Sequence, residues 1–164
     1  MASINNNKTT LSYVAMAGII AGVYAALTVF LAPISFGVLQ FRVSEALTLL
    51  PVMLPTSIPG LTIGCFLGNL ISGAPWQDIV FGSIATLLAA MGTRFFRRHM
   101  WLAAFMPVLS NGLIVGAVLS FVNGIPFWPT AASVAIGEAA VCYMLGIPLI
   151  KLLKNHFKDE YIGK

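Results

Sequence analysis

Charged residues are scarce in this sequence. Asp, Glu, Lys and Arg make up 9% of the 164 residues, whereas hydrophobic residues make up 59%. A soluble domain contains roughly a quarter charged residues, so too few are present here to cover a surface that faces water. Soluble globular, disordered, collagen-like and extracellular disulfide-scaffold classes are therefore excluded. The mean hydropathy of +0.92 instead predicts an all-α integral membrane protein, with a single domain over residues 1–164.

Motifs of ATP hydrolysis and of intramembrane catalysis are also missing from the sequence. Without a GxxxxGK[ST] phosphate loop, the chain is not itself an ATP-driven pump. It contains neither HExxH nor GxSxG, so we expect no catalytic residue, no metal and no cofactor. Cys65 and Cys142 lack CxxC spacing, and we interpret them as buried small residues. The basic cluster at residues 94–99 is interpreted as a topology anchor facing anionic lipid, without a nucleic-acid partner.

The apolar stretches of the chain predict six transmembrane helices. Their expected positions are residues 11–32, 36–54, 60–72, 79–96, 101–122 and 129–153. A span needs about 20 residues, so the second and third helices are short. Pro51, Pro55 and Pro59 interrupt any helix that contains them. We expect such short helices to be tilted, broken or covered by their neighbours.

Basic residues are distributed unevenly over this six-helix layout. With six spans, both ends of the chain lie on one side of the membrane. Only Arg42 falls on the other side, and the first side receives the other eight of the nine basic residues: Lys8, Arg94, Arg97, Arg98, Lys151, Lys154, Lys158 and Lys164. The positive-inside rule then places both termini in the cytoplasm.

Several polar and aromatic residues fall in the outer half of the predicted bundle. A charge in the membrane costs about 2.5 to 3.5 kcal/mol on insertion scales, so each charged side chain there needs a reason. Glu138 is the deepest, roughly 13 Å into the last predicted helix at 1.5 Å per residue. The residues that we expect to converge on one outward-facing pocket are Arg42, Glu45, Asn69, Trp76, Asp78, Asn111, Trp128 and Glu138.

Most of these residues also have an interpretation without a ligand. Arg42 and Glu45 are spaced i, i+3 and can neutralise each other. Asp78 suits the N-terminal cap of a helix, the two tryptophans suit an interfacial belt, and the two asparagines suit contacts between helices. Glu138 has no basic partner in its own helix, and small residues flank it. A role in the pocket explains it better, with Arg42 as a candidate partner across the bundle.

The first predicted helix carries two rows of small residues at four-residue spacing. One row contains Ala17, Ala21 and Ala25, and the adjacent row contains Gly18, Gly22 and Ala26. Small residues at this spacing let another helix approach closely in lipid. The pattern predicts either a partner interface or ordinary packing inside the bundle.

Residues 37–51 and 58–69 carry a more specific signal, which includes Phe-Arg-Val-Ser-Glu-Ala at residues 41–46. With the chain length and the six-helix layout, this sequence resembles the QueT family. These proteins are substrate-binding S-components of energy-coupling-factor (ECF) transporters. The resemblance covers most of the chain and implies three partners, a transmembrane coupling subunit and two cytoplasmic ATPases. Ala17 and Ala21 match the Ala-xxx-Ala contact motif for the coupling subunit. The expected location is the bacterial cytoplasmic membrane.

The resemblance also implies a ligand, 7-aminomethyl-7-deazaguanine (prequeuosine). A carboxylate can accept hydrogen bonds from the amine and N–H of the ring, and a second one suits the cationic aminomethyl group. We expect Glu45 and Glu138 to divide these tasks. We expect Arg42 and either Asn69 or Asn111 to donate hydrogen bonds to the ligand. Trp76 or Trp128 stacks on the ring or closes the pocket. Two alternatives remain, an S-component for another vitamin-like heterocycle and a stand-alone proton-coupled transporter or small channel.

Overall fold

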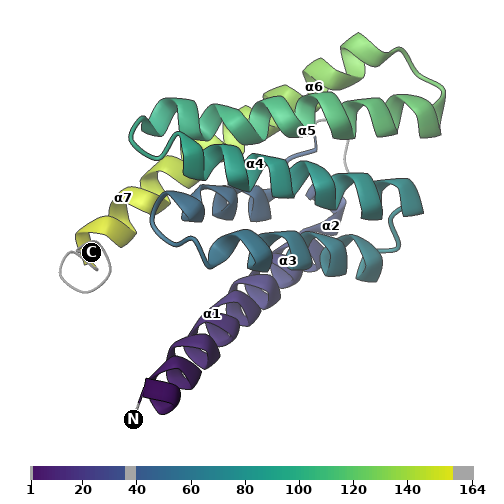
Figure 1. Cartoon of the computed structure of the whole chain (residues 1–164). Coiled ribbons are helices and arrows are strands. Elements are labelled where there is room, and N and C mark those ends of the chain that lie inside the picture. The colour runs from purple at the N-terminus through teal and green to yellow at the C-terminus, as the bar shows by residue number, and fades with distance from the viewer. Residues whose placement is uncertain (1, 36–39, 157–164) are drawn as a thin grey trace.

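The structure of the protein is a computed structural model, which describes residues 2–35 and 40–156, with side chains from residue 10 onward. Within this part of the chain every regular element is helical (Figure 1). Residues 36–39, where the second predicted helix begins, lie outside the described residues, as do Lys158 and Lys164 and the side chain of Lys8. The predicted all-helical fold is confirmed for the described part.

The helices follow the predicted order closely. They are α1 (Ala2–Phe30), α2 (Ala32–Ser35), η1 (Val43–Val52), α3 (Ser57–Ile71), η2 (Asp78–Gly82), α4 (Ser83–Phe95), α5 (Met100–Asn123), α6 (Phe127–Val141), η3 (Cys142–Gly146) and α7 (Ile147–His156). The element η1 is a 3₁₀-helix, whereas η2 and η3 are π-helical turns that continue into α4 and α7. Such π-helical turns occur frequently at functional sites.

Four helical stretches of the described chain are long and apolar enough to cross a membrane. They are Thr10–Phe30, Asp78–Phe95, Met100–Asn123 and Phe127–His156. The helices Val43–Val52 and Ser57–Ile71 are apolar but shorter, as predicted for the second and third elements. The second is shorter than expected because Arg42, just before it, is extended, with φ −86° and ψ 91°.

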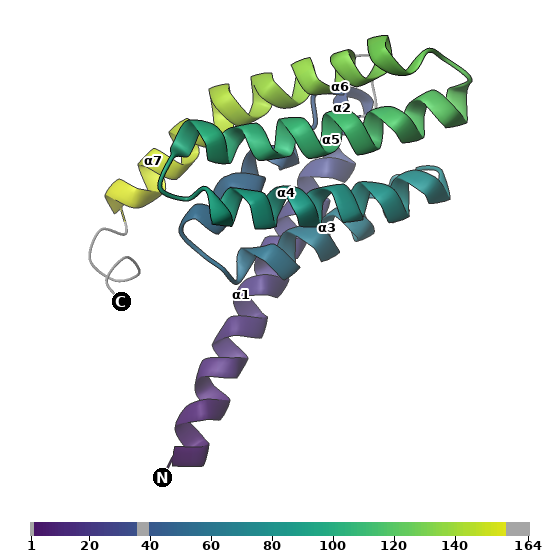
Figure 2. The ribbon, with the colours of Figure 1, turned by 45° about the horizontal axis from the view of Figure 1, so that its top comes forward.

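The short helix η1 lies at the centre of the bundle. It contacts α1, α3, α4, α5, α6, η3 and α7. Figures 1 and 2 show α3, α4 and α5 running side by side, while the N-terminal part of α1 projects away from them. The start of α1, the turn between α4 and α5 and the end of α7 lie at one end of the bundle, and the α5–α6 turn lies at the other.

Helices α1 and α3 approach each other closely at glycines of α3. A Cβ atom added at Gly64 would lie 2.8 Å from the Ala21 carbonyl oxygen and 2.8 Å from the Tyr24 Cβ. Ala21 and Ala25 are consequently buried, with 5% and 8% of their surface exposed. Ala21 and Ala25 therefore pack inside the chain, which is the second of the two interpretations that the sequence left open, whereas Ala17 is half-buried.

The adjacent row of small residues on α1 faces outward. A Cβ atom added at Gly18 or Gly22 would meet nothing within 4 Å, and Ala26 is exposed. Of the two rows, this one is open to a partner helix, because α3 already covers Ala21 and Ala25.

The end of η1 is held by Arg94 of α4. The Arg94 guanidinium donates hydrogen bonds to the Pro51 carbonyl oxygen at 3.1 Å and to that of Val52 at 3.3 Å. The last carbonyls of a helix lack partners within it, and a cation there also suits the helix dipole. Arg94 thus anchors η1, while Arg97 and Arg98 of the same basic cluster are exposed.

Candidate functional site

All three acidic residues in the described part of the chain gather in one buried polar cluster. Glu45 lies in η1, Asp78 begins η2 and Glu138 lies in α6. Their exposed fractions are 1%, 2% and 3%. Glu45 and Glu138 line one cavity with Arg42, which is paired with Asp78, so the fold brings these three acidic residues together as predicted. Arg42 is 5% exposed and brings a guanidinium to the same cluster.

Arg42 forms an ion pair with Asp78. The Arg42 Nη2 and Asp78 Oδ2 atoms are 3.6 Å apart, and both side chains are buried. Asp78 Oδ1 has no hydrogen-bond partner among the described residues, so this carboxylate pairs with Arg42 instead of capping its helix. The sequence had offered Glu45 and Glu138 as partners of Arg42, and both line the same cavity as Arg42.

Glu45 accepts a hydrogen bond from the Tyr24 hydroxyl of α1 through its Oε1 atom. Its Oε2 atom has no hydrogen-bond partner among the described residues. Tyr24 is completely buried, and the sequence analysis did not identify it. A signal was present, because Tyr24 follows Ala17 and Ala21 at helical spacing and places a polar hydroxyl in the middle of an apolar span.

Glu138 and Glu45 face a shared environment at η1, α5 and α6. The Cys142 thiol lies 3.6 Å from Glu138 Oε1 and 3.8 Å from the Glu45 carbonyl oxygen. The Asn111 side chain lines the same cavity as both carboxyl groups. Of the two predicted asparagines, Asn111 is thus the one that lies at the cavity with the two glutamates.

A small cavity lies between these groups. Its lining residues are Gln40, Arg42, Glu45, Asn111, Val115, Val134 and Glu138. Its free volume of about 10 Å³ has room for about one water molecule, whereas ligand pockets usually measure about 300 Å³ or more. The cavity is therefore too small for a heterocycle, which enters only if the surrounding groups separate. Gln40, which the sequence analysis did not identify, has a positive φ of 45°, a backbone conformation uncommon outside glycine.

Asn69 lies beside the cluster without lining the cavity. Its Nδ2 atom donates to the Asp78 carbonyl oxygen at 3.1 Å and lies 3.6 Å from the Cys65 sulfur. Asn69 therefore joins α3 to η2, which agrees with its interpretation as a contact between helices.

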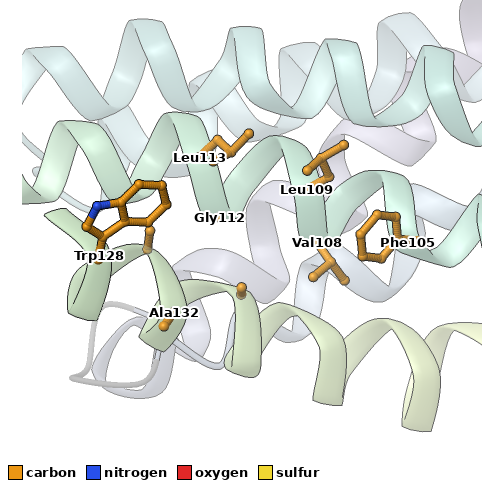
Figure 3. A pocket seen from close by; sticks show the side chains of 9 residues that line it. Phe105, Val108, Leu109, Gly112, Leu113, Trp128 and Ala132 are labelled. Carbon is orange, nitrogen blue, oxygen red and sulfur yellow. The ribbon is translucent and has the colours of Figure 1, made fainter.

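Neither tryptophan of the predicted pocket lies at this cavity. Trp76 and Trp128 are 66% and 75% exposed. Trp128 lines an apolar groove of about 270 Å³ between α5 and α6 (Figure 3), and Trp76 lines another of about 620 Å³ beside α5. Both positions fit the interfacial-belt interpretation. Hydropathy places the two residues at helix ends but does not give the direction in which their rings point.

Long apolar helices around a buried, charged cavity are typical of membrane proteins that move polar solutes. The family profile described as QueT transporter matches residues 14–155. The chain belongs to this transporter family, which confirms the resemblance seen at residues 37–51 and 58–69.

One relative is the "Queuosine precursor transporter QueT" of Lactococcus lactis subsp. cremoris (strain MG1363). It is 30% identical to this chain over 154 residues, which cover 84% of this chain and 89% of the relative. No solved structure gives a significant match.

Proposed function

We propose that the chain is the substrate-binding S-component of an ECF-type importer and that it captures a queuosine precursor, with 7-aminomethyl-7-deazaguanine as the ligand. The transporter family and the name of the Lactococcus relative support the class of substrate. The aminomethyl group of this ligand is cationic, which agrees with the charges around the cavity.

In the buried cluster the carboxyl groups outnumber the positively charged groups, and this observation carries the proposal. The cluster contains three carboxyl groups and one guanidinium, Arg42, which is paired with Asp78. Glu45 and Glu138 line the same cavity. An ionised carboxylate in the membrane is costly unless a positive group accompanies it. A cationic ligand supplies that group, and its ring donors satisfy the remaining carboxylate oxygens.

The cavity residues suggest how the ligand is held. Glu45 and Glu138 divide the amine and ring contacts, and Asn111 donates to the ring carbonyl in place of Asn69. The flat ring lies against Val115 and Val134, the two apolar residues of the lining, instead of against a tryptophan. Binding widens the cavity because its present volume is that of about one water molecule.

Isothermal titration of the purified protein with 7-aminomethyl-7-deazaguanine tests these assignments. Removing a charged hydrogen-bond partner costs about 1.5–3 kcal/mol, so we expect Glu45→Gln and Glu138→Gln each to weaken binding roughly 10- to 150-fold. The control is Asn123→Asp, an amide–carboxyl exchange at an exposed helix end, which should leave the affinity unchanged. Unchanged affinity in both glutamate variants would contradict the carboxylate assignment.

The identity of the ligand has a separate test. Mass spectrometry of the small molecule that co-purifies with the protein distinguishes the deazaguanine from another heterocycle. Uptake by this chain alone in proteoliposomes, driven by a pH gradient, would favour a proton-coupled transporter instead.

The energy for transport comes from partners in this proposal, a coupling subunit and two ATPases. We place both termini in the cytoplasm of a bacterium, with the chain in the cytoplasmic membrane, because eight of nine basic residues fall on that side of a six-span layout. The coupling subunit contacts the exposed row Gly18, Gly22 and Ala26 of α1, since α3 covers the alanine row.

Substitution on the exposed row tests the partner contact. Gly22→Leu should prevent co-purification with the coupling subunit and ATPases of the same bacterium while ligand binding is retained. Ala132→Leu, at an exposed position on α6, is the control. Normal assembly of the Gly22→Leu variant would remove this row of α1 from the mechanism.

A further inference from the structure

We propose that Tyr24 is a positioning residue of the ligand site: its hydroxyl fixes one oxygen of the Glu45 carboxylate so that the other oxygen is held ready for the ligand. This inference rests on the proposed function, because it assigns Glu45 to ligand binding. It adds a residue from α1, a helix that contributes nothing to the lining of the cavity.

The contacts of Glu45 carry the argument. Its Oε1 atom accepts the Tyr24 hydroxyl, whereas its Oε2 atom is buried and has no hydrogen-bond partner among the described residues. Glu45 itself lines the cavity. A buried carboxylate with one oxygen bound and the other unsatisfied is poised to accept a donor that arrives with a ligand.

The position of Tyr24 is in turn determined by close packing. Gly64 lets α3 approach so closely that an added Cβ would lie 2.8 Å from the Tyr24 Cβ. One turn further along α1, the Thr28 hydroxyl donates to the Tyr24 carbonyl oxygen at 3.0 Å and lies 2.8 Å from the Ser44 hydroxyl. Two neighbouring side-chain contacts therefore join α1 to the first turn of η1, and the Tyr24 ring has little freedom to move.

A double-mutant cycle on ligand affinity separates positioning from general structural support. The probe is 7-aminomethyl-7-deazaguanine, titrated into the full-length purified protein. Tyr24→Phe keeps the ring but removes the hydroxyl, and we expect it to weaken binding at least tenfold. If Tyr24 acts through Glu45, the same substitution made in the Glu45→Gln background should have less than a twofold effect, because coupled residues are not additive.

Tyr143→Phe is the matched control. Its hydroxyl also donates one hydrogen bond, to the Trp101 carbonyl oxygen at 3.1 Å, but Tyr143 lies in η3 and does not line the cavity. We expect the affinity of this variant to equal that of the wild type. If Tyr24→Phe does not yield folded protein, Gly64→Ala replaces it in the same double-mutant cycle with Glu45→Gln, since it displaces Tyr24 without changing a polar group.

The outcomes distinguish this inference from the proposed function. Wild-type affinity in Tyr24→Phe, together with weak binding by Glu45→Gln, overturns the role of Tyr24 and leaves the ligand assignment intact. An equal loss from Tyr24→Phe in both backgrounds also overturns it, because the effect is then structural. Unchanged affinity of the Glu45→Gln variant would instead contradict the proposed function, which assigns Glu45 to ligand binding.

Discussion

The Arg42–Asp78 pair offers the sharpest test of how the buried cluster is stabilised. The two charged atoms are 3.6 Å apart. With an effective dielectric constant of about 20, unit charges at this distance attract by about 5 kcal/mol. Breaking a buried pair by removing one partner typically costs about 3–5 kcal/mol. Asp78→Asn, which keeps the shape of the side chain, should therefore lower the free energy of unfolding by about 3–5 kcal/mol.

A loss of this size is measurable as thermal unfolding in detergent. For a chain of this length each kcal/mol lowers Tm by roughly 2–4 °C, so the expected fall is about 6–20 °C. The double variant Arg42→Gln/Asp78→Asn should be more stable than the sum of the single effects predicts, because it leaves no unpaired charge at this contact. Arg97→Gln, at an exposed arginine, is the control. Wild-type stability in Asp78→Asn, or additive effects in the double variant, would refute the reasoning.

Three further predictions concern helix packing and the ligand. Gly64→Ala should lower Tm, because the added Cβ would lie 2.8 Å from the backbone of α1 and such overpacking costs about 1–3 kcal/mol. The control is Gly22→Ala, which has open space around it and should leave Tm unchanged or raise it. Arg94→Gln should cost about 1.5–3 kcal/mol of stability, through the lost hydrogen bonds to the end of η1, with Arg97→Gln again as the control. Saturating 7-aminomethyl-7-deazaguanine should raise the Tm of the wild type, by about 2.7 kcal/mol of stabilisation at 100 times Kd, whereas a deazaguanine without the aminomethyl group should raise it less.

The small volume of the cavity means that the helices around it must move apart before a heterocycle can bind. Glu45 lies on η1, and Asn111 and Glu138 lie on α5 and α6, so opening the cavity means moving η1 relative to this pair of helices. Arg94 anchors the far end of η1 to α4. The first turn of η1, which carries Glu45, is joined to α1 through Tyr24 and Thr28, so both ends of η1 are held by neighbouring helices.

Much of the fold followed from the sequence because hydropathy and turn chemistry act locally. A stretch of about 20 apolar residues is sufficient to form a spanning helix, and the four long helical stretches agree with the first and the last three predicted spans. The three prolines between residues 51 and 59 predicted that the second and third helices would be short. The family followed from the local segment at residues 41–46.

The cost of burying charge also identified most of the candidate site. Glu45, Asp78, Glu138 and Arg42 were singled out because charged side chains do not persist in lipid without a partner. The structure places all four in one buried cluster. For these residues, the sequence was sufficient to predict that they belong together, without predicting which of them pair.

Only the tertiary structure decided the pairing and the direction of each side chain. It paired Arg42 with Asp78, joined Tyr24 to Glu45 and turned both tryptophans away from the cavity. It also buried Ala21 and exposed the Gly18 row of the same helix. In a soluble protein, polar residues mark the outer face of a helix. Here the outer face touches lipid and is as apolar as the core, so the rotation of each helix about its axis is settled by packing against its neighbours.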